Sequence, residues 1–219
     1  MNLLFLGLPG CGVRETARIA ADRLGLRFVD TDEVLTRNLS LSLQDVYSLF
    51  TPDALRDLLK RLAGQLAAGE DYCIAVGDCF LDMPEALEIL TSRGFAVWLD
   101  LSPEEAVSRC LEPGHPALRR GLFRLRELYE ERRGLAASVP DALLPADGLT
   151  PGELAERASA LFAGERSGRL RDALETNRLS LVPLLTERAE LLGMTEEEAE
   201  RYIAAVLAPP GRDISESED

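Results

Sequence analysis

Lysine is almost absent from this chain of 219 residues, because only Lys60 among its 24 basic residues is a lysine. A site whose chemistry needs a lysine therefore has one candidate, whereas arginine is plentiful. Histidine is equally scarce, and His115 is the only one.

Long apolar runs and an excess of positive charge are also missing. No run is long enough to span a membrane, and no secretion signal opens the sequence, so we expect a cytoplasmic protein. The formal net charge of −14 argues against nucleic acid or an anionic membrane as the main partner. The four cysteines lack metal-ligand spacing and are expected to be reduced thiols; they are Cys11, Cys73, Cys79 and Cys110.

Short apolar runs alternate with helical patterns along the first three quarters of the chain. The runs predict buried strands over Asn2–Leu6, Arg27–Val29, Tyr72–Val76, Ala96–Asp100 and Ala142–Pro145. The patterns predict helices over Glu15–Leu24, Leu41–Ala68 with a break at Thr51 and Pro52, Pro84–Arg93, Pro103–Cys110, Leu122–Ala137 and Pro151–Phe162. This alternation predicts an α/β fold with a parallel five-stranded sheet covered on both faces.

Ligands of such folds bind at the carboxyl ends of the strands. The segments Gly7–Gly12, Asp30–Asp32 and Gly77–Cys79 all follow predicted strands. We therefore expect them to face one crevice.

The pattern changes after Gly164, where two further helices are predicted over Arg169–Leu192 and Thr195–Leu207. Thr195 and Glu198 have the spacing of a capping box. The expected organisation is an α/β domain over 1–165, a helical hairpin over 166–208 and a disordered acidic tail over 209–219. An apolar stripe on the hairpin could cover the core or form a homodimer; it consists of Leu179, Val182, Leu185, Ala189 and Leu192.

The first strand leads into a glycine-rich turn and then a helix, which is the layout of a phosphate-binding loop. The pattern G-x-x-x-x-G-K-[ST] starts at Gly7 and would place lysine at 13 and serine or threonine at 14. Val13 and Arg14 stand there instead. Val13 supplies no charge and Arg14 no oxygen ligand; the Arg14 guanidinium could take the place of Mg²⁺ by pairing with Asp30, or it could point to solvent.

Residues 2 to about 163 resemble the shikimate kinases, P-loop kinases of the nucleoside-monophosphate-kinase-like group. The resemblance consists of short motifs in the family's order and spacing. They are Gly7–Glu15, Phe28–Asp32, Leu55–Asp57, Gly77–Cys79, Leu99–Glu104 with Arg109, His115–Leu118, Glu131–Ala136 and Leu144–Pro151. It implies a three-layer P-loop kinase fold, ATP and Mg²⁺ as cofactors, and a small carboxylate such as shikimate as substrate.

On the phosphate side, the resemblance implies a damaged site. The implied nucleotide-binding residues are Gly7, Gly10, Gly12, Arg14, Arg109 and His115. Asp30 matches a carboxylate associated with Mg²⁺, and His115 stands in place of a lid arginine. Removing one electrostatic contact of this kind typically costs about two to three orders of magnitude in rate, so three losses predict very little kinase activity.

On the substrate side, the resemblance implies a better preserved site. The implied substrate-binding residues are Asp32, Arg56, Gly77 and Arg132. Asp32 matches the aspartate that holds a ring hydroxyl and accepts its proton, and the two arginines match a clamp on the carboxylate. Asp78 and Cys79 replace glycines, however, so side chains intrude and Asp78 places negative charge beside a carboxylate ligand.

Each match also has a plainer structural interpretation. Gly10 and Gly12 can serve the turn alone, and Asp30 can be a helix cap. Arg56 and Arg132 can be surface residues of helices, and His115 an ordinary loop residue.

Two functions follow from these patterns. The first is a catalytically weak or inactive homologue that binds a small carboxylate ligand or a protein partner and needs no cofactor. The alternative is an active ATP-dependent kinase of shikimate or a similar hydroxy acid. In that case Asp32 and Arg14 are catalytic, and Arg14 or an arginine between 119 and 126 replaces the loop lysine.

Overall fold

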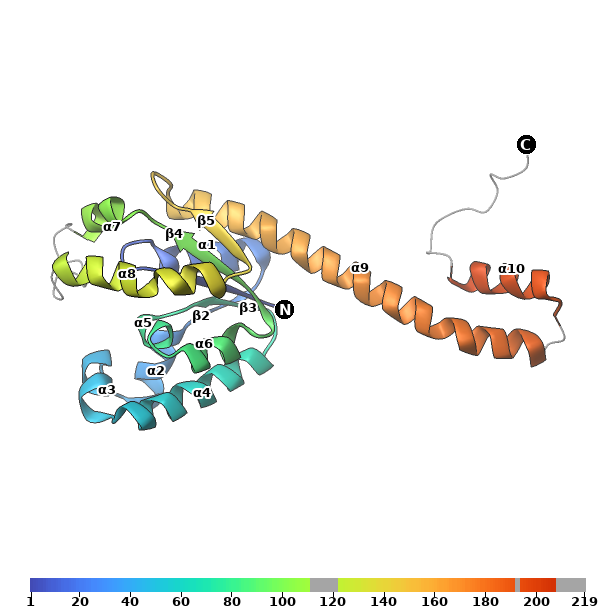
Figure 1. The fold of residues 1–219 in the computed structure, drawn as a ribbon, viewed down its shortest axis with the longest axis horizontal. Helices are drawn as coiled ribbons and strands as arrows, with labels where there is room; N and C mark the ends of the chain where they lie inside the picture. Colours follow the sequence, from blue (N-terminus) through green and yellow to red (C-terminus); the bar gives the residue numbers. More distant parts are fainter. Residues whose placement is uncertain (111–121, 192–193, 208–219) are drawn as a thin grey trace. The chain divides into compact units, whose positions relative to one another are not determined.

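A five-stranded parallel sheet forms the centre of the computed structural model, which describes residues 1–110, 122–191 and 194–207 (Figure 1). The strands are β1 (Asn2–Gly7), β2 (Arg27–Asp30), β3 (Tyr72–Ala75), β4 (Gly94–Asp100) and β5 (Ala142–Pro145). Their order across the sheet is β2-β3-β1-β4-β5, and all pairs are parallel. The predicted fold class is confirmed.

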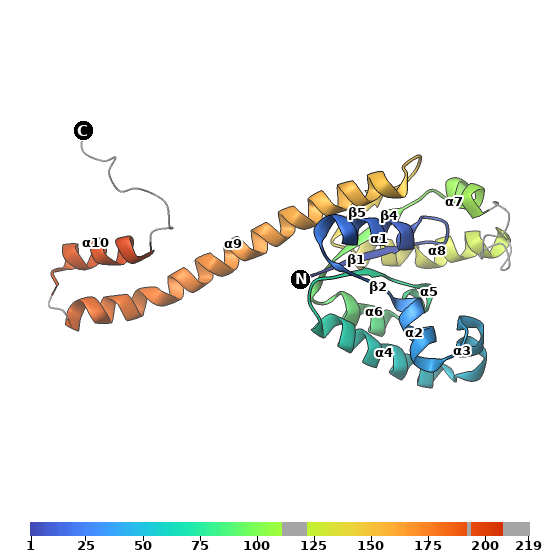
Figure 2. The ribbon, with the colours of Figure 1, turned by 180° about the vertical axis from the view of Figure 1, so that it is seen from behind.

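Helices connect the strands. Their bounds are α1 Val13–Leu24, α2 Thr31–Leu39, α3 Leu43–Leu49, α4 Pro52–Ala68, α5 Asp78–Leu81, α6 Pro84–Thr91, α7 Pro103–Cys110, α8 Leu122–Ser138, α9 Pro151–Leu191 and α10 Glu196–Leu207. Helix α1 lies on one face of the sheet, whereas α4 and α6 lie on the other (Figures 1 and 2). Both faces are therefore covered, as the continuous apolar strands require.

Successive residues of β1 belong to opposite cores. Leu3 and Phe5 are in the cluster with α1 and the start of α9, whereas Leu4 and Leu6 are in the cluster with α4 and α6. All four side chains have 0% exposure. Strand side chains alternate between faces, so one apolar strand supports two cores.

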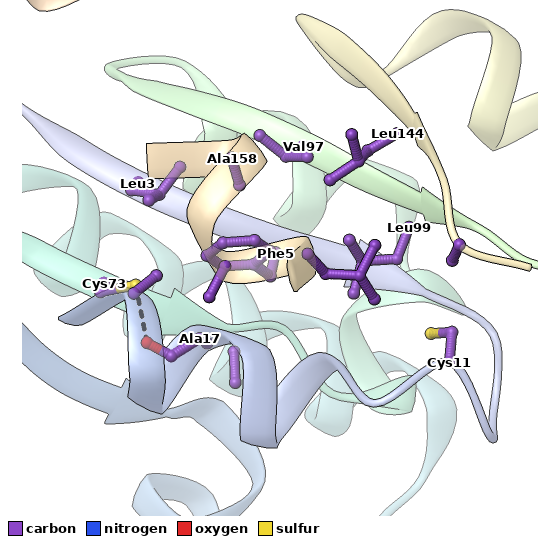
Figure 3. Packing of buried hydrophobic residues seen from close by; sticks show 14 of the residues in the cluster. Leu3, Phe5, Cys11, Ala17, Cys73, Val97, Leu99, Leu144 and Ala158 are labelled. Carbon is purple, nitrogen blue, oxygen red and sulfur yellow. Dashed lines mark hydrogen bonds between the residues drawn. The ribbon is translucent and has the colours of Figure 1, made fainter. Parts of the chain in front are cut away.

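Close packing of α1 on the sheet depends on small residues. Figure 3 shows Ala17 of α1 near Cys73 of β3, whose Sγ donates a hydrogen bond to the Ala17 carbonyl oxygen at 3.1 Å. Alanine side chains let the helix backbone come this near to the strands. This close packing helps to position the glycine-rich turn, because α1 begins at that turn.

Two short helices, α2 and α5, were not expected from the sequence. The Asp30 carboxylate caps α2 by accepting hydrogen bonds from the N–H groups of Asp32 and Glu33 at 2.9 and 3.1 Å. The plainer interpretation of Asp30 as a helix cap therefore holds. The expected cap Thr51 and first-turn Pro52 of α4 are also confirmed.

The expected end of a helix at Phe162 is wrong, because α9 continues through Gly164 to Leu191. One glycine within a helix costs about 1 kcal/mol, which good helix formers on either side can offset. Pro183 lies inside this helix.

The chain divides into two compact units, Met1–Glu165 and Arg166–Asp219. The second contains the end of α9 and α10, and the predicted capping box is formed, since Thr195 and Glu198 exchange hydrogen bonds. The side chains of Leu179 and Leu192 lie outside the described part, so a homodimer through this unit stays a prediction. Within that part, the helices are too short or too polar to cross a membrane.

The two cores predict a large contrast between equivalent truncations. Leu4→Ala, at a fully buried position, should lower the free energy of unfolding by about 2–5 kcal/mol through lost burial and a cavity. Leu49→Ala removes the same atoms from a side chain that is 68% exposed and should change the free energy of unfolding by about 0.5 kcal/mol or less. Urea denaturation measures both, and equal losses would contradict the described packing.

Candidate functional site

A cleft of about 780 Å³ opens at the carboxyl ends of β1, β2 and β3. Among the residues that line it are the predicted site residues Gly7, Gly10, Gly12, Arg14, Asp30, Asp32, Gly77 and Arg109. The expectation that the three strand ends share one crevice is confirmed for these positions. Cys79 is instead buried behind the wall at 2% exposure, and burial raises the pKa of its thiol to about 11.

The glycine-rich turn has the backbone of a phosphate-binding loop. Gly10 and Gly12 have φ angles of 91° and 77°, values that other residues adopt only with strain. Gly12 is the N-cap of α1, and no side chain caps this end. Free N–H groups at the start of a helix attract anions.

Cys11 lies within this turn but is not a reactive thiol. Its Sγ donates a hydrogen bond to the Leu8 carbonyl oxygen at 2.7 Å, and its side chain is 1% exposed. Burial raises the pKa of the thiol to about 12. The thiolate needed for redox chemistry is therefore scarce at neutral pH.

Arg14 takes the first of the two orientations considered from the sequence. Its Nε lies 3.2 Å from Asp30 Oδ2 and its Nη2 lies 3.4 Å from Glu33 Oε2. Asp30 is 7% exposed, whereas the Arg14 side chain is 53% exposed and lines the cleft. The guanidinium thus links the start of α1 to the start of α2.

This arrangement does not fit Mg²⁺. Oδ1 of Asp30 accepts two backbone N–H groups and Oδ2 is paired with Arg14, so both oxygens of the expected metal ligand are engaged. Position 14 has no hydroxyl to offer. Among the described residues, no three His, Cys, Asp or Glu side chains are grouped to hold a metal ion.

Asp32 and Gly77 are in direct contact. A Cβ on Gly77 would collide with the Asp32 carboxylate, so a glycine is needed at this strand end. The Gly77 N–H donates to Thr31 Oγ1 at 2.8 Å, which ties the start of α2 to the end of β3. The position of Asp32 in the cleft depends on both contacts.

Arg109 lies on the opposite wall and is held by three acceptors. Its Nε donates to Glu105 at 3.0 Å, and its Nη2 donates to the carbonyl oxygens of Ala146 and Leu149 at 3.2 and 3.3 Å. A guanidinium held in one plane can stack on a flat ring. The role of Arg109 in nucleotide binding, which the resemblance implies, stays a prediction.

The two arginines expected to clamp a carboxylate do not line the cleft. Arg56 lies on α4 and pairs with Asp53 at 2.6 Å, with its side chain 42% exposed. Arg132 on α8 is 3% exposed, and its Nη1 and Nη2 bind Asp78 and Asp82 at 2.7 and 2.8 Å. Burial lowers the pKa of Arg132, but the two aspartates raise this pKa by a larger amount, so its net change is upward.

The carboxylate partners of Arg132 were not predicted from the sequence. Asp78 and Asp82 are four residues apart, a spacing that places side chains on one face of a helical turn. That spacing was the available signal for a shared partner, but the sequence could not name Arg132. His115 lies outside the described residues, as do the side chains of the arginines between 119 and 126.

A parallel five-stranded sheet and a glycine-rich turn that runs into α1 define a P-loop kinase fold. The family model of shikimate kinase matches residues 9–161. This chain therefore belongs to the shikimate kinase family.

Individual relatives agree with the family model. A shikimate kinase of Symbiobacterium thermophilum is 32% identical over 144 residues, which are 64% of this chain and 83% of that protein. One from Persephonella marina is 24% identical over 151 residues, covering 68% and 92%. The structure of shikimate kinase from Acinetobacter baumannii in complex with shikimate has a TM-score of 0.67 at 20% identity, covering 75% and 93%. That structural likeness supports the fold.

The contact between Asp32 and Gly77 can be tested with one methyl group. Gly77→Ala should lower the free energy of unfolding by about 1–3 kcal/mol, because the new Cβ displaces the Asp32 carboxylate. Gly64→Ala is the control, since a Cβ there meets nothing within 4 Å and alanine favours the helix. Urea denaturation measures both, and a neutral Gly77→Ala would show that Asp32 does not pack there.

Proposed function

We propose that this chain is a shikimate kinase homologue with a degraded ATP site, which binds a small hydroxylated ligand of the shikimate type and has little or no kinase activity. The observation that carries the proposal is the pairing of Arg14 with Asp30. Phosphoryl transfer depends on positioning the phosphates and neutralising their charge. Here the loop arginine is held by carboxylates of the chain itself.

The charge of the cleft supports the same conclusion. Among the described residues, its ionisable lining consists of four carboxylates and two guanidinium groups: Glu15, Asp30, Asp32, Asp78, Arg14 and Arg109. Both guanidinium groups are paired with carboxylates. Such a lining repels the polyphosphate of a nucleotide and needs a cation to offset it.

The Asp32 carboxylate makes the cleft suitable for a hydroxylated ligand. Asp32 lines the cleft, and a carboxylate there can accept hydrogen bonds from hydroxyl groups. The Acinetobacter relative was solved with shikimate. A molecule of that type is therefore the first to test.

The second candidate function is an active kinase in which Arg14 replaces the loop lysine. One observation favours it, namely that the Arg14 side chain is 53% exposed at the start of α1, beside the loop. To serve a phosphate, Arg14 would have to leave Asp30. Val13 and Arg14, which differ from the phosphate-loop pattern, are therefore the residues that decide between the two functions.

Titration calorimetry with ATP and Mg²⁺ tests the proposal. The wild-type chain should show no binding with a Kd below about 1 mM, the upper end of the usual range for enzyme substrates. The double variant Val13→Lys with Arg14→Ser should gain binding, because it frees Asp30 and restores the loop cation.

Arg37→Ser is the matched control, because Arg37 also pairs with Glu33, at 2.9 Å, but does not line the cleft. It should behave as the wild type does. Micromolar binding of Mg-ATP by the wild-type chain, with phosphoryl transfer to shikimate, would overturn the proposal in favour of the active kinase.

A further inference from the structure

Arg132 is the most deeply buried charged group beside the cleft, and the chain supplies both of its partners. Its side chain is 3% exposed, and its two terminal nitrogens bind different carboxylates at 2.7 and 2.8 Å. The partners are Asp78, the first residue of α5, and Asp82, which caps the end of that helix. A guanidinium fork accepts planar carboxylates in this way.

The two aspartates differ in their access to the cleft. Asp78 lines it, whereas Arg132 and Asp82 are not among its lining residues. A molecule entering the cleft therefore meets the carboxylate of Asp78 before the guanidinium behind it. To a ligand, this part of the wall is negative although a buried arginine stands behind it.

An acidic ligand would have to displace Asp78 to reach Arg132. Asp78 competes at the high effective concentration of a group on the same chain. A displaced Asp78 would also stand beside the carboxylate of the ligand, and like charges brought together disfavour binding. An uncharged hydroxylated molecule meets neither obstacle.

We propose that Asp78 is a specificity-determining residue, which holds Arg132 as an internal carboxylate and makes the cleft select uncharged hydroxylated molecules over carboxylic acids. The inference rests on the proposed function, because it names the class of ligand that the same cleft accepts. It changes the expectation for Arg132, whose guanidinium serves a side chain of this chain and not the ligand.

The test compares shikimate with its methyl ester, which has the same hydroxyl groups and no charge. Calorimetry on the full chain should give the wild type an affinity for the ester at least as high as for the acid. Asp78→Ala removes the competing carboxylate and leaves Arg132 paired with Asp82. It should raise the affinity for the acid at least about tenfold, the effect of one hydrogen bond to a charged group, and leave the ester unchanged.

Asp82→Ala is the matched control, because it removes the other carboxylate on Arg132 from outside the cleft. It should leave the ratio of acid to ester affinity as in the wild type. Asp78→Asn keeps the shape of the side chain and removes its charge, so it should shift the ratio in the same direction as Asp78→Ala. It provides the test if Asp78→Ala does not fold. Thermal melting establishes which variants are folded.

Three results would overturn the inference. They are tighter binding of acid than of ester by the wild type, an unchanged ratio in folded Asp78 variants, and an equal gain in Asp82→Ala. The ester reports separately on the proposed function. If the ester binds but the ratio of acid to ester affinity is unchanged in the Asp78 variants, the inference alone is wrong. If neither molecule binds to any variant, both the inference and the proposed function are wrong.

Discussion

The carboxylate of Asp30 is the contact on which the phosphate end of the cleft depends. One oxygen caps α2 and the other pairs with Arg14 of α1, so a single buried group joins the end of β2 to the starts of two helices. It is 7% exposed, and burying a charge is costly unless the charge is paired, so a nearby cation, the Arg14 guanidinium, offsets this cost. A phosphate-binding site would take that cation from a bound metal, whereas this chain takes it from its own loop.

Pairing of an arginine with carboxylates of the same chain recurs around the cleft. Arg109 is paired with Glu105, and Arg132 with Asp78 and Asp82. In the described part of the chain, the arginines at or beside the cleft are thus paired with carboxylates of the chain itself. The protein has a net charge of −14 and a single lysine, so its carboxylates outnumber the basic side chains with which they can pair.

The strands could be predicted because several of them are continuous apolar runs, and parallel topology then predicted which loops meet. Asp30, Asp32 and Gly77 share the cleft for that reason. Helices α2 and α5 were not predicted because each is short and lies close behind a strand end. For α9, both parts were predicted as helices, but their continuity was missed because Gly164 was interpreted as a boundary. The partners of Arg132 could not be predicted, since α8 and α5 are far apart in the chain and only packing brings them together.

The pairings of Arg14 and of Arg132 are separate in physical terms. Arg14 is held by Asp30 and Glu33, and Arg132 by Asp78 and Asp82, so the contacts described for the two groups have no residue in common. Restoring the loop would free Asp30 but leave Arg132 occupied, and releasing Arg132 would leave the loop without a lysine. Under the proposed function, phosphorylation of an acid would therefore require changes at both Arg14 and Asp78, because neither change alone alters both pairings.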